Sequence, residues 1–143
     1  MILPDVNVLI SAFRTDAPHH RACFEFLTEA LSSRERFGLS PLALSAVVRI
    51  TTNPRAFNNI STLEEAFEFC NYLSGQPNCQ LVSPADKHWH IFQTICLETN
   101  TRGRTVTDAW FAALAIEWGC QWVTLDRDFA RFPALQWRLL EAR

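Results

Sequence analysis

The chain has 143 residues, enough for one domain with a buried core, and we expect a single domain over residues 1–143. Hydrophobic residues make up 48% and charged residues 20%, as in soluble globular proteins, and no run of about 18 apolar residues is present to span a membrane. The net charge is −2, yet 12 of the 13 basic residues are arginine, a bidentate phosphate ligand, so charge neither supports nor excludes a nucleic-acid partner.

The first half of the chain predicts two strands and two helices. A continuous apolar stretch indicates a short buried strand over residues 2–8, in which Pro4 restricts hydrogen bonding to one side. Residues 16–32 predict a helix, because apolar side chains recur there with the spacing of one helical face. Residues 37–39 are expected as a short strand, and residues 41–53 as a helix that begins at a proline and stops before Pro54.

The next stretch predicts two more helices. Residues 62–65, Thr-Leu-Glu-Glu, match the capping box that opens many helices. Residues 83–86 offer another helix start, after which Trp89, Phe92 and Cys96 fall on one stripe. Both segments are therefore expected as amphipathic helices.

The last third alternates polar turns with apolar segments. Residues 100–104 form a polar loop, and residues 107–119 predict a helix that ends at a glycine. Residues 121–125 indicate a strand, residues 126–132 a turn with a short helix, and residues 134–140 a final edge strand. Short strands alternating with helices predict an α/β fold with a short central parallel sheet flanked by helices.

Several aspartates occupy the ends of these elements. Asp5 follows the first apolar strand, Asp126 follows the strand over residues 121–125, and Asp108 lies at the start of the preceding helix. In open parallel sheets, ligands bind beyond the carboxyl ends of the strands, so Asp5 and Asp126 are expected to share one crevice. Spacing alone does not bring Asp108 to them. Each acid also has a structural explanation: Asp5, Asp126 and Asp128 as helix caps, and Asp108 as a complement to the dipole of its helix.

Clustered carboxylates would suit a hard divalent cation. An acid directly after a buried strand is poorly solvated unless a cation meets it. Mg²⁺ and Mn²⁺ prefer oxygen ligands, and such ions orient phosphodiesters, activate water and offset charge on the leaving oxygen. Phosphodiester hydrolysis is therefore the reaction class that this pattern favours.

Three stretches resemble the PIN-domain ribonucleases, and among them the VapC toxins of bacterial toxin–antitoxin pairs. They are residues 5–10 (Asp-Val-Asn-Val-Leu-Ile), 106–115 and 124–129 (Thr-Leu-Asp-Arg-Asp-Phe), in this order along nearly the whole chain. Residues 49–57 and 129–133 are similar to a mycobacterial-type VapC subgroup. One such motif is weak evidence, but the ordered set is specific.

The resemblance implies a PIN-like fold and an Mg²⁺- or Mn²⁺-dependent endoribonuclease. In the family, the residues matching Asp5, Asp108 and Asp126 line one acidic pocket that binds the metal, and the residue matching Asp128 often assists. VapC-like enzymes cut RNA, usually transfer or ribosomal RNA, with a metal-activated water and leave a 3′-hydroxyl and a 5′-phosphate. The resemblance also implies a VapB-like antitoxin as partner, and a homodimer.

One departure from the family pattern bears on catalysis. Most PIN domains carry a glutamate early in the helix that corresponds to residues 41–52, whereas this segment contains no acid, and Val47 or a neighbour occupies the position. Loss of one ligand would weaken metal binding. The alternative is a catalytically impaired PIN fold that binds RNA or an antitoxin.

Basic and histidine side chains offer weaker signals. Arg102 and Arg104 lie in the loop before Asp108, a suitable place to meet RNA phosphates, or they are solvated loop charges. The histidines do not match zinc-site spacings, and metal-dependent hydrolysis needs no histidine base. We interpret them as packing or surface residues.

The cysteines and the N-terminus bear on location. The five cysteines are odd in number and contain no C-x-x-C pair, so we expect reduced core thiols. The first five residues lack the basic segment of a signal peptide. A cytoplasmic protein is expected.

The helix that begins at Thr62 carries more apolar residues than one narrow stripe holds, including Phe67, Phe69 and Tyr72. This surplus indicates an interface with an antitoxin or a second copy, and a fully buried helix would explain it equally well.

Other enzyme classes fit less well. An aspartate-nucleophile phosphohydrolase normally has a second aspartate at the position of Asn7 and a lysine in its pocket, and Lys87 has no evident link to Asp5. A Rossmann dinucleotide site needs G-x-G-x-x-G, and the chain contains four scattered glycines.

Overall fold

The protein is described by a computed structural model that covers residues 1–141. Its strands are β1 (Ile2–Pro4), β2 (Phe37–Leu39), β3 (Cys79–Leu81), β4 (Gln121–Thr124) and β5 (Trp137–Leu139). Its helices are α1 (Val6–Phe13), α2 (His20–Ser32), α3 (Pro41–Thr51), α4 (Leu63–Ser74), α5 (His88–Thr99) and α6 (Val106–Trp118), with short 3₁₀ helices η1 (Gly103–Thr105) and η2 (Arg127–Arg131).

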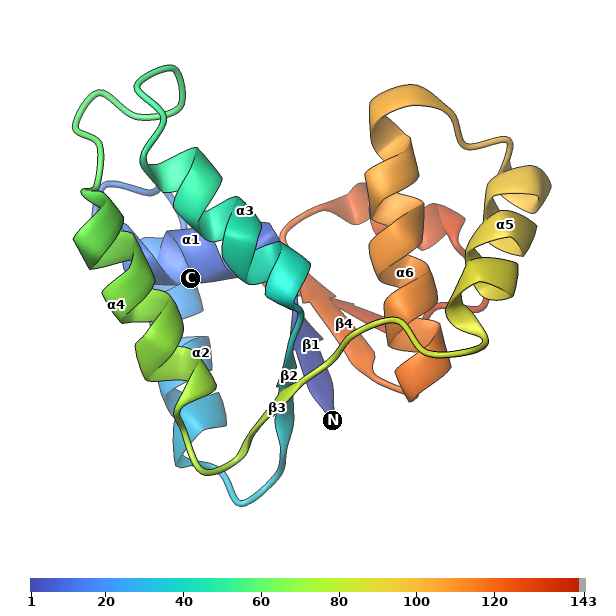
Figure 1. The fold of residues 1–143 in the computed structure, drawn as a ribbon, viewed down its shortest axis with the longest axis horizontal. Helices are drawn as coiled ribbons and strands as arrows, with labels where there is room; N and C mark the ends of the chain where they lie inside the picture. Colours follow the sequence, from blue (N-terminus) through green and yellow to red (C-terminus); the bar gives the residue numbers. More distant parts are fainter. Residues whose placement is uncertain (142–143) are drawn as a thin grey trace.

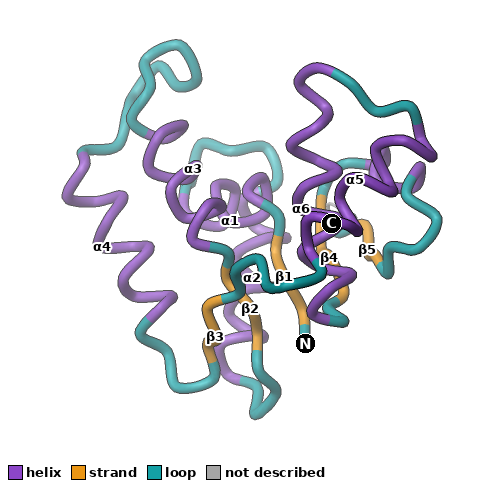
Figure 2. Tube along the Cα trace, turned by 45° about the vertical axis from the view of Figure 1, so that its right-hand side comes forward, coloured by secondary structure: helices purple, strands orange, loops and turns teal. Residues whose placement is uncertain are grey.

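All the strand pairs are parallel, and the five strands lie in the order β3-β2-β1-β4-β5. Helices α1–α4 gather on one side of the molecule and α5 and α6 on the other (Figures 1 and 2). This arrangement confirms the predicted α/β fold with a central parallel sheet. It also brings the carboxyl ends of β1 and β4 to one edge, since Pro4 pairs with Val123.

The predicted strand over residues 2–8 is wrong in its second half. The strand ends at Pro4, and residues 6–13 form α1, with Asp5 in an extended conformation at its N-cap. Residues 8–12 are all buried, and the helix has only eight residues, most of them apolar. A continuous apolar run does not distinguish a buried strand from a buried helix.

Three further differences concern the second half of the chain. The edge strand β3 was not predicted, because it has three residues and its side chains are half-buried or exposed. The stripe of Trp89, Phe92 and Cys96 is not the buried face of α5: Trp89 is 69% exposed, while His88 and Ile95 are buried. The final strand β5 is also shorter than the predicted residues 134–140.

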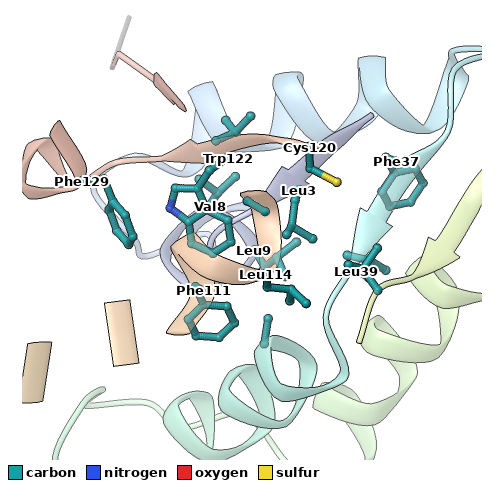
Figure 3. Packing of buried hydrophobic residues seen from close by; sticks show 14 of the residues in the cluster. Leu3, Val8, Leu9, Phe37, Leu39, Phe111, Leu114, Cys120, Trp122 and Phe129 are labelled. Atoms are coloured by element: carbon teal, nitrogen blue, oxygen red, sulfur yellow. The ribbon is translucent and has the colours of Figure 1, made fainter. Parts of the chain in front are cut away.

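Other local predictions are confirmed. The capping box closes in both directions, with Thr62 Oγ1 accepting from the backbone of Glu65 and the Glu65 carboxylate accepting from Thr62. Gly119 ends α6 with φ 65°, in the left-handed region that favours glycine. The core is built around α6, and Figure 3 shows Phe111, Trp122 and Phe129 packed together, with successive ring centroids 5.3 and 5.4 Å apart. Within residues 1–141, no helix is long and apolar enough to cross a membrane.

Candidate active site

The predicted acids lie at the edge of the sheet where β1 and β4 end. Asp5 directly follows β1, Asp126 lies two residues beyond β4, and Asp108 is in the first turn of α6. Asp128 is exposed in the first turn of η2. Chain segments more than one hundred residues apart thus supply carboxylates to the same end of the molecule.

Asp5 is the most buried of these acids, with 8% of its surface exposed. Its side chain makes no capping hydrogen bond to α1; instead, Oδ2 accepts from the Thr124 hydroxyl at 2.6 Å. Burial raises the pKa of Asp5 to about 6, and the charge of Asp108 pushes the pKa the same way, while the Thr124 hydroxyl and the N–H groups of Val6 and Asn7 oppose the rise. No basic residue compensates the charge of the Asp5 carboxylate among the described ion pairs.

Thr124 connects the two strand ends and is fully buried. Besides donating to Asp5, its hydroxyl oxygen accepts from the Asp126 backbone at 3.0 Å and from Asn7 Nδ2 at 3.4 Å. Asn7 Oδ1 in turn accepts from Leu125 N at 3.3 Å. This network fixes the direction of the Asp5 carboxylate relative to the β4 loop.

Sequence reasoning did not assign roles to Asn7 and Thr124. Both residues lie inside the stretches that carry the family resemblance, residues 5–10 and 124–129. Their place inside these stretches was the one sequence signal that they belong to the site. The contacts themselves span 117 and 119 residues, so they follow only from the tertiary structure.

Asp108 is two-thirds buried and makes an ion pair within the molecule. The Arg131 guanidinium lies 3.3 Å from its Oδ2 atom. Burial raises the pKa of Asp108, and the charges of Asp126 and Asp128 add to the rise, whereas Arg131 lowers the pKa. The charge of Asp108 raises the pKa of Asp5, and the charges of Asp126 and Asp128 raise the pKa of Asp108. Asp108 therefore interacts electrostatically with Asp5 and with both acids near η2.

Asp126 caps the short helix η2, which is the structural role that the sequence suggested for it. Its Oδ1 atom caps η2 by accepting from the backbone of Asp128 at 2.9 Å. The second carboxylate oxygen has no hydrogen bond among the described residues. A structural cap and a metal ligand are therefore compatible in one side chain.

The side chains do not form a closed metal centre by themselves. In the part of the chain covered by the structure, no group of three or more His, Cys, Asp and Glu side chains lies close enough to hold a metal ion. The donors at this edge are nevertheless all carboxylate oxygens, the set that Mg²⁺ and Mn²⁺ prefer over zinc or copper. A divalent ion there would compensate Asp5 and Asp108, whose pKa values are raised by burial and by neighbouring carboxylates.

Helix α3 adds no acid to this edge. Ser40 caps it by accepting from Ala43 N, and Val47 is fully buried in the core. None of residues 41–51 is acidic, and the expected glutamate position at Val47 or a neighbour therefore supplies no carboxylate. Among the described residues, the predicted acids follow β1 and β4 or lie in η2 and α6.

The arginines named from the sequence lie on loops. Arg102 and Arg104 are both exposed, and Arg102 donates to the Asn100 side chain at 2.9 Å. Neither touches a carboxylate of the site among the described contacts. His88, in contrast, is buried and bonds to the Trp110 carbonyl at 3.0 Å, so its interpretation as a packing residue is confirmed.

The apolar surplus on α4 lies on the surface. Phe67 is 52% and Tyr72 60% exposed, so the alternative of a fully buried helix is wrong. Between α3 and α4 runs a groove of about 530 Å³, and Leu44, Leu63 and Phe67 contribute to its lining. A groove of this kind fits an apolar partner segment.

Comparison with known proteins identifies relatives over nearly the full chain. Residues 2–135 match the PIN domain. Ribonuclease VapC25 of Mycobacterium tuberculosis is 36% identical over 136 residues, which cover 95% of this chain and 96% of that protein. Ribonuclease VapC31 of the same organism is 35% identical over 136 residues, with the same coverage of 95% and 96%.

A solved structure agrees with this relationship at the level of the fold. The structure of VapBC2 from Rickettsia felis, bound to a DNA fragment from their promoter, has a TM-score of 0.73 to this chain at 14% identity. The match covers 99% of this chain and 100% of that one.

Proposed function

The chain belongs to the PIN-domain family, and from this membership we propose that it is an Mg²⁺- or Mn²⁺-dependent endoribonuclease of the VapC type. Its reaction is hydrolysis of RNA phosphodiester bonds, with transfer or ribosomal RNA as substrate. Asp5, Asp108 and Asp126 hold the ion, and Asp128 assists them.

The Asp5 carboxylate carries this proposal. It is 8% exposed, its pKa is raised to about 6, and none of the ion pairs within residues 1–141 includes it. An ionised carboxylate in such a place is costly unless a cation compensates it. A divalent ion shared with Asp108 would relieve both the burial and the repulsion between the two acids.

Each residue contributes through its own contacts. Thr124 and Asn7 hold Asp5 in one direction, and the cap on η2 leaves one Asp126 oxygen free to face the same edge. When bound, the divalent ion supplies a polarised water and charge compensation for the phosphodiester. The chain itself fixes where the carboxylates lie and shields Asp5 from bulk water.

RNA cleavage tests the proposal directly. The purified chain is incubated with total RNA in Mn²⁺, with and without EDTA, alongside Asp5→Asn and the matched control Asp16→Asn. Asp16 is an exposed acid that pairs with Arg14. We expect discrete fragments with 5′-phosphate ends from the wild type and Asp16→Asn, and none from Asp5→Asn or in EDTA.

A non-catalytic RNA-binding module is the second candidate, favoured by the absence of an acid in α3. RNA that is bound by the wild type in Mn²⁺ but remains intact would establish this module and exclude the nuclease. Cleavage that survives both EDTA and Asp5→Asn would exclude metal-dependent catalysis at these residues.

We also propose a VapB-like antitoxin as partner and a homodimer as the assembly, in the cytoplasm. Exposed Phe67 and the apolar α3–α4 groove support an interface on this side of the molecule, and the five cysteines are free thiols. Phe67→Asp is expected to weaken antitoxin capture or dimerisation without loss of RNA cleavage. Light scattering of the free chain and of the co-expressed pair measures both.

A further inference from the structure

Arg131 is the one basic residue found in contact with an acid of the site within residues 1–141. It ends η2, five residues after Asp126, and its Nη2 atom lies 3.3 Å from Asp108 Oδ2. This distance is long for a charge-assisted hydrogen bond, which is typically about 2.7–2.9 Å. The two side chains are 32% and 33% exposed, so solvent reaches both. The contact is an open ion pair at the edge of the site.

The Arg131 guanidinium is held in one orientation, but most of its N–H donors have no partner among the described residues. It lies over the ring of Phe132, 4.8 Å from the centroid, and Phe132 is 1% exposed. Its Nε atom is buried and has no hydrogen-bond partner among the described residues. A guanidinium carries five N–H donors, and the Asp108 contact uses one of them.

Arg14 shows what a structural arginine looks like in the same molecule. Its guanidinium donates to both Asp16 oxygens, to Ser61 Oγ at 2.8 Å and to the Asn59 carbonyl, and it stacks on the Phe57 ring. Its side chain is 11% exposed. Arg131 makes fewer hydrogen bonds than Arg14 and is more exposed. A purely structural role therefore does not account for its position beside Asp108.

We propose that Arg131 binds a phosphate oxygen of the RNA at the scissile position, an inference that rests on the proposed nuclease function. A phosphate that approaches Asp5, Asp108 and Asp126 meets like charge, and Arg131 is the basic residue that contacts one of these acids among the described residues. Its planar fork suits two phosphate oxygens, and it stays protonated, so it transfers no proton. It stabilises negative charge that grows on the phosphate during cleavage.

The test measures RNA affinity apart from catalysis. A labelled single-stranded RNA is titrated by fluorescence anisotropy in EDTA, where the proposed cleavage stops, against wild type, Arg131→Gln and Arg131→Lys. Arg138→Gln is the matched control, because Arg138 is exposed and also lies over a phenylalanine, 5.5 Å from the Phe26 ring. Melting temperatures show whether each variant is folded, and Arg131→Lys keeps the charge should Arg131→Gln be unstable.

We expect Arg131→Gln to weaken RNA binding roughly tenfold, as for loss of a charged hydrogen bond, and Arg138→Gln to change it less than about twofold. The slope of log K against log salt should fall by about 0.7, the value for one phosphate contact with a single strand. Mn²⁺ affinity should not weaken, since the change removes a positive charge.

Unchanged RNA affinity and salt slope in a folded Arg131→Gln would overturn the inference, even if Mn²⁺ affinity rises, because Arg131 would then be only a counter-ion of Asp108. A failure of this inference can be distinguished from a failure of the proposed function. Failure of the wild type to cleave RNA in Mn²⁺ would sink the nuclease, whereas the binding titration contains no cleavage step.

Discussion

An aspartate lies near each end of helix α1, and the surroundings shift the pKa values of the two aspartates in opposite directions. At its C-terminal end, Arg14 and Asp16 neutralise each other, and the hydrogen bonds from Arg14 lower the pKa of Asp16. At its N-terminal end, Asp5 is buried, has only neutral hydrogen-bond donors around it among the described residues, and its pKa is raised to about 6. The eight residues of α1 thus lie between Asp16, whose charge is compensated by Arg14, and Asp5, whose charge is not compensated by a basic residue.

This difference separates structural acids from acids suited to a ligand. Glu65 belongs with Asp16, because the N–H and hydroxyl of Thr62 lower its pKa within the capping box. Asp108 belongs with Asp5, since burial raises its pKa despite the Arg131 contact. A carboxylate that the fold leaves uncompensated is available to bind a cation, and functional sites are where such groups gather.

The largest expected effect is on catalysis. Asp5→Asn and Asp108→Asn each remove a proposed ligand and should lower kcat/KM for RNA on the order of 1000-fold, whereas Asp16→Asn should stay within about threefold of wild type. Rates are measured on a defined RNA in Mn²⁺. Equal losses in all three variants would erase the distinction between the two ends of α1.

Thr124→Val tests the support of Asp5 by its neighbour. The change removes the hydroxyl that donates to Asp5 Oδ2, and we expect Mn²⁺ affinity to fall about 10- to 100-fold, as for loss of a residue that orients a metal ligand. Thr124→Ser keeps the hydroxyl and should bind Mn²⁺ nearly as wild type. Similar affinities for valine and serine would show that the hydrogen bond does not matter.

Arg14→Ala tests the structural end. The truncation removes the contacts to Asn59, Ser61 and the Phe57 ring that fasten the loop after α3 to α1. We expect the melting temperature to fall by roughly 5 °C. Arg21→Ala, which removes an 86% exposed arginine paired with Glu25, should change it by less than about 1 °C. A stable Arg14→Ala would contradict the structural assignment.

The last effect is a gain of stability that is confined to the metal-free protein. Because the folded state raises the Asp5 pKa, folded chains hold that proton to higher pH, and the free energy of unfolding falls as pH rises from ~4 to about 6. Asp5→Asn removes this loss and should be more stable by about 3 kcal/mol above pH 7 in EDTA. Near pH 4 the gain should vanish. Denaturant unfolding at both pH values measures it, and a gain that is independent of pH would point to packing instead.

Much of the fold was predictable because local signals agree with it. The capping box at Thr62, Pro41 at the start of α3 and Gly119 at the end of α6 each mark a boundary that the structure confirms. Helix α1 and strand β3 were missed. The first is a helix of only eight mostly apolar residues, and the second is a three-residue edge strand with little burial, so both are too short for their periodicity to identify them.

The site was less predictable than the fold. Strand ends indicated that Asp5 and Asp126 share an edge, but the roles of Asn7 and Thr124 depend on contacts across 117 or more residues. The Asp108–Arg131 pair joins two helices that no local pattern relates. Hydrogen bonds between distant segments follow from tertiary packing, which a single sequence does not reveal.

Calorimetric titration of Mn²⁺ near pH 6, repeated in two buffers of different ionisation enthalpy, examines the strand-end acids most directly. At this pH Asp5 is about half protonated, so binding at its carboxylate must release a fraction of a proton. Wild type and Asp16→Asn should bind one set of ions with this release, and Asp5→Asn should lose both the affinity and the proton. Binding that is unaltered in Asp5→Asn, or no binding by the wild type at any pH up to 8, would contradict a divalent-ion site at the ends of β1 and β4.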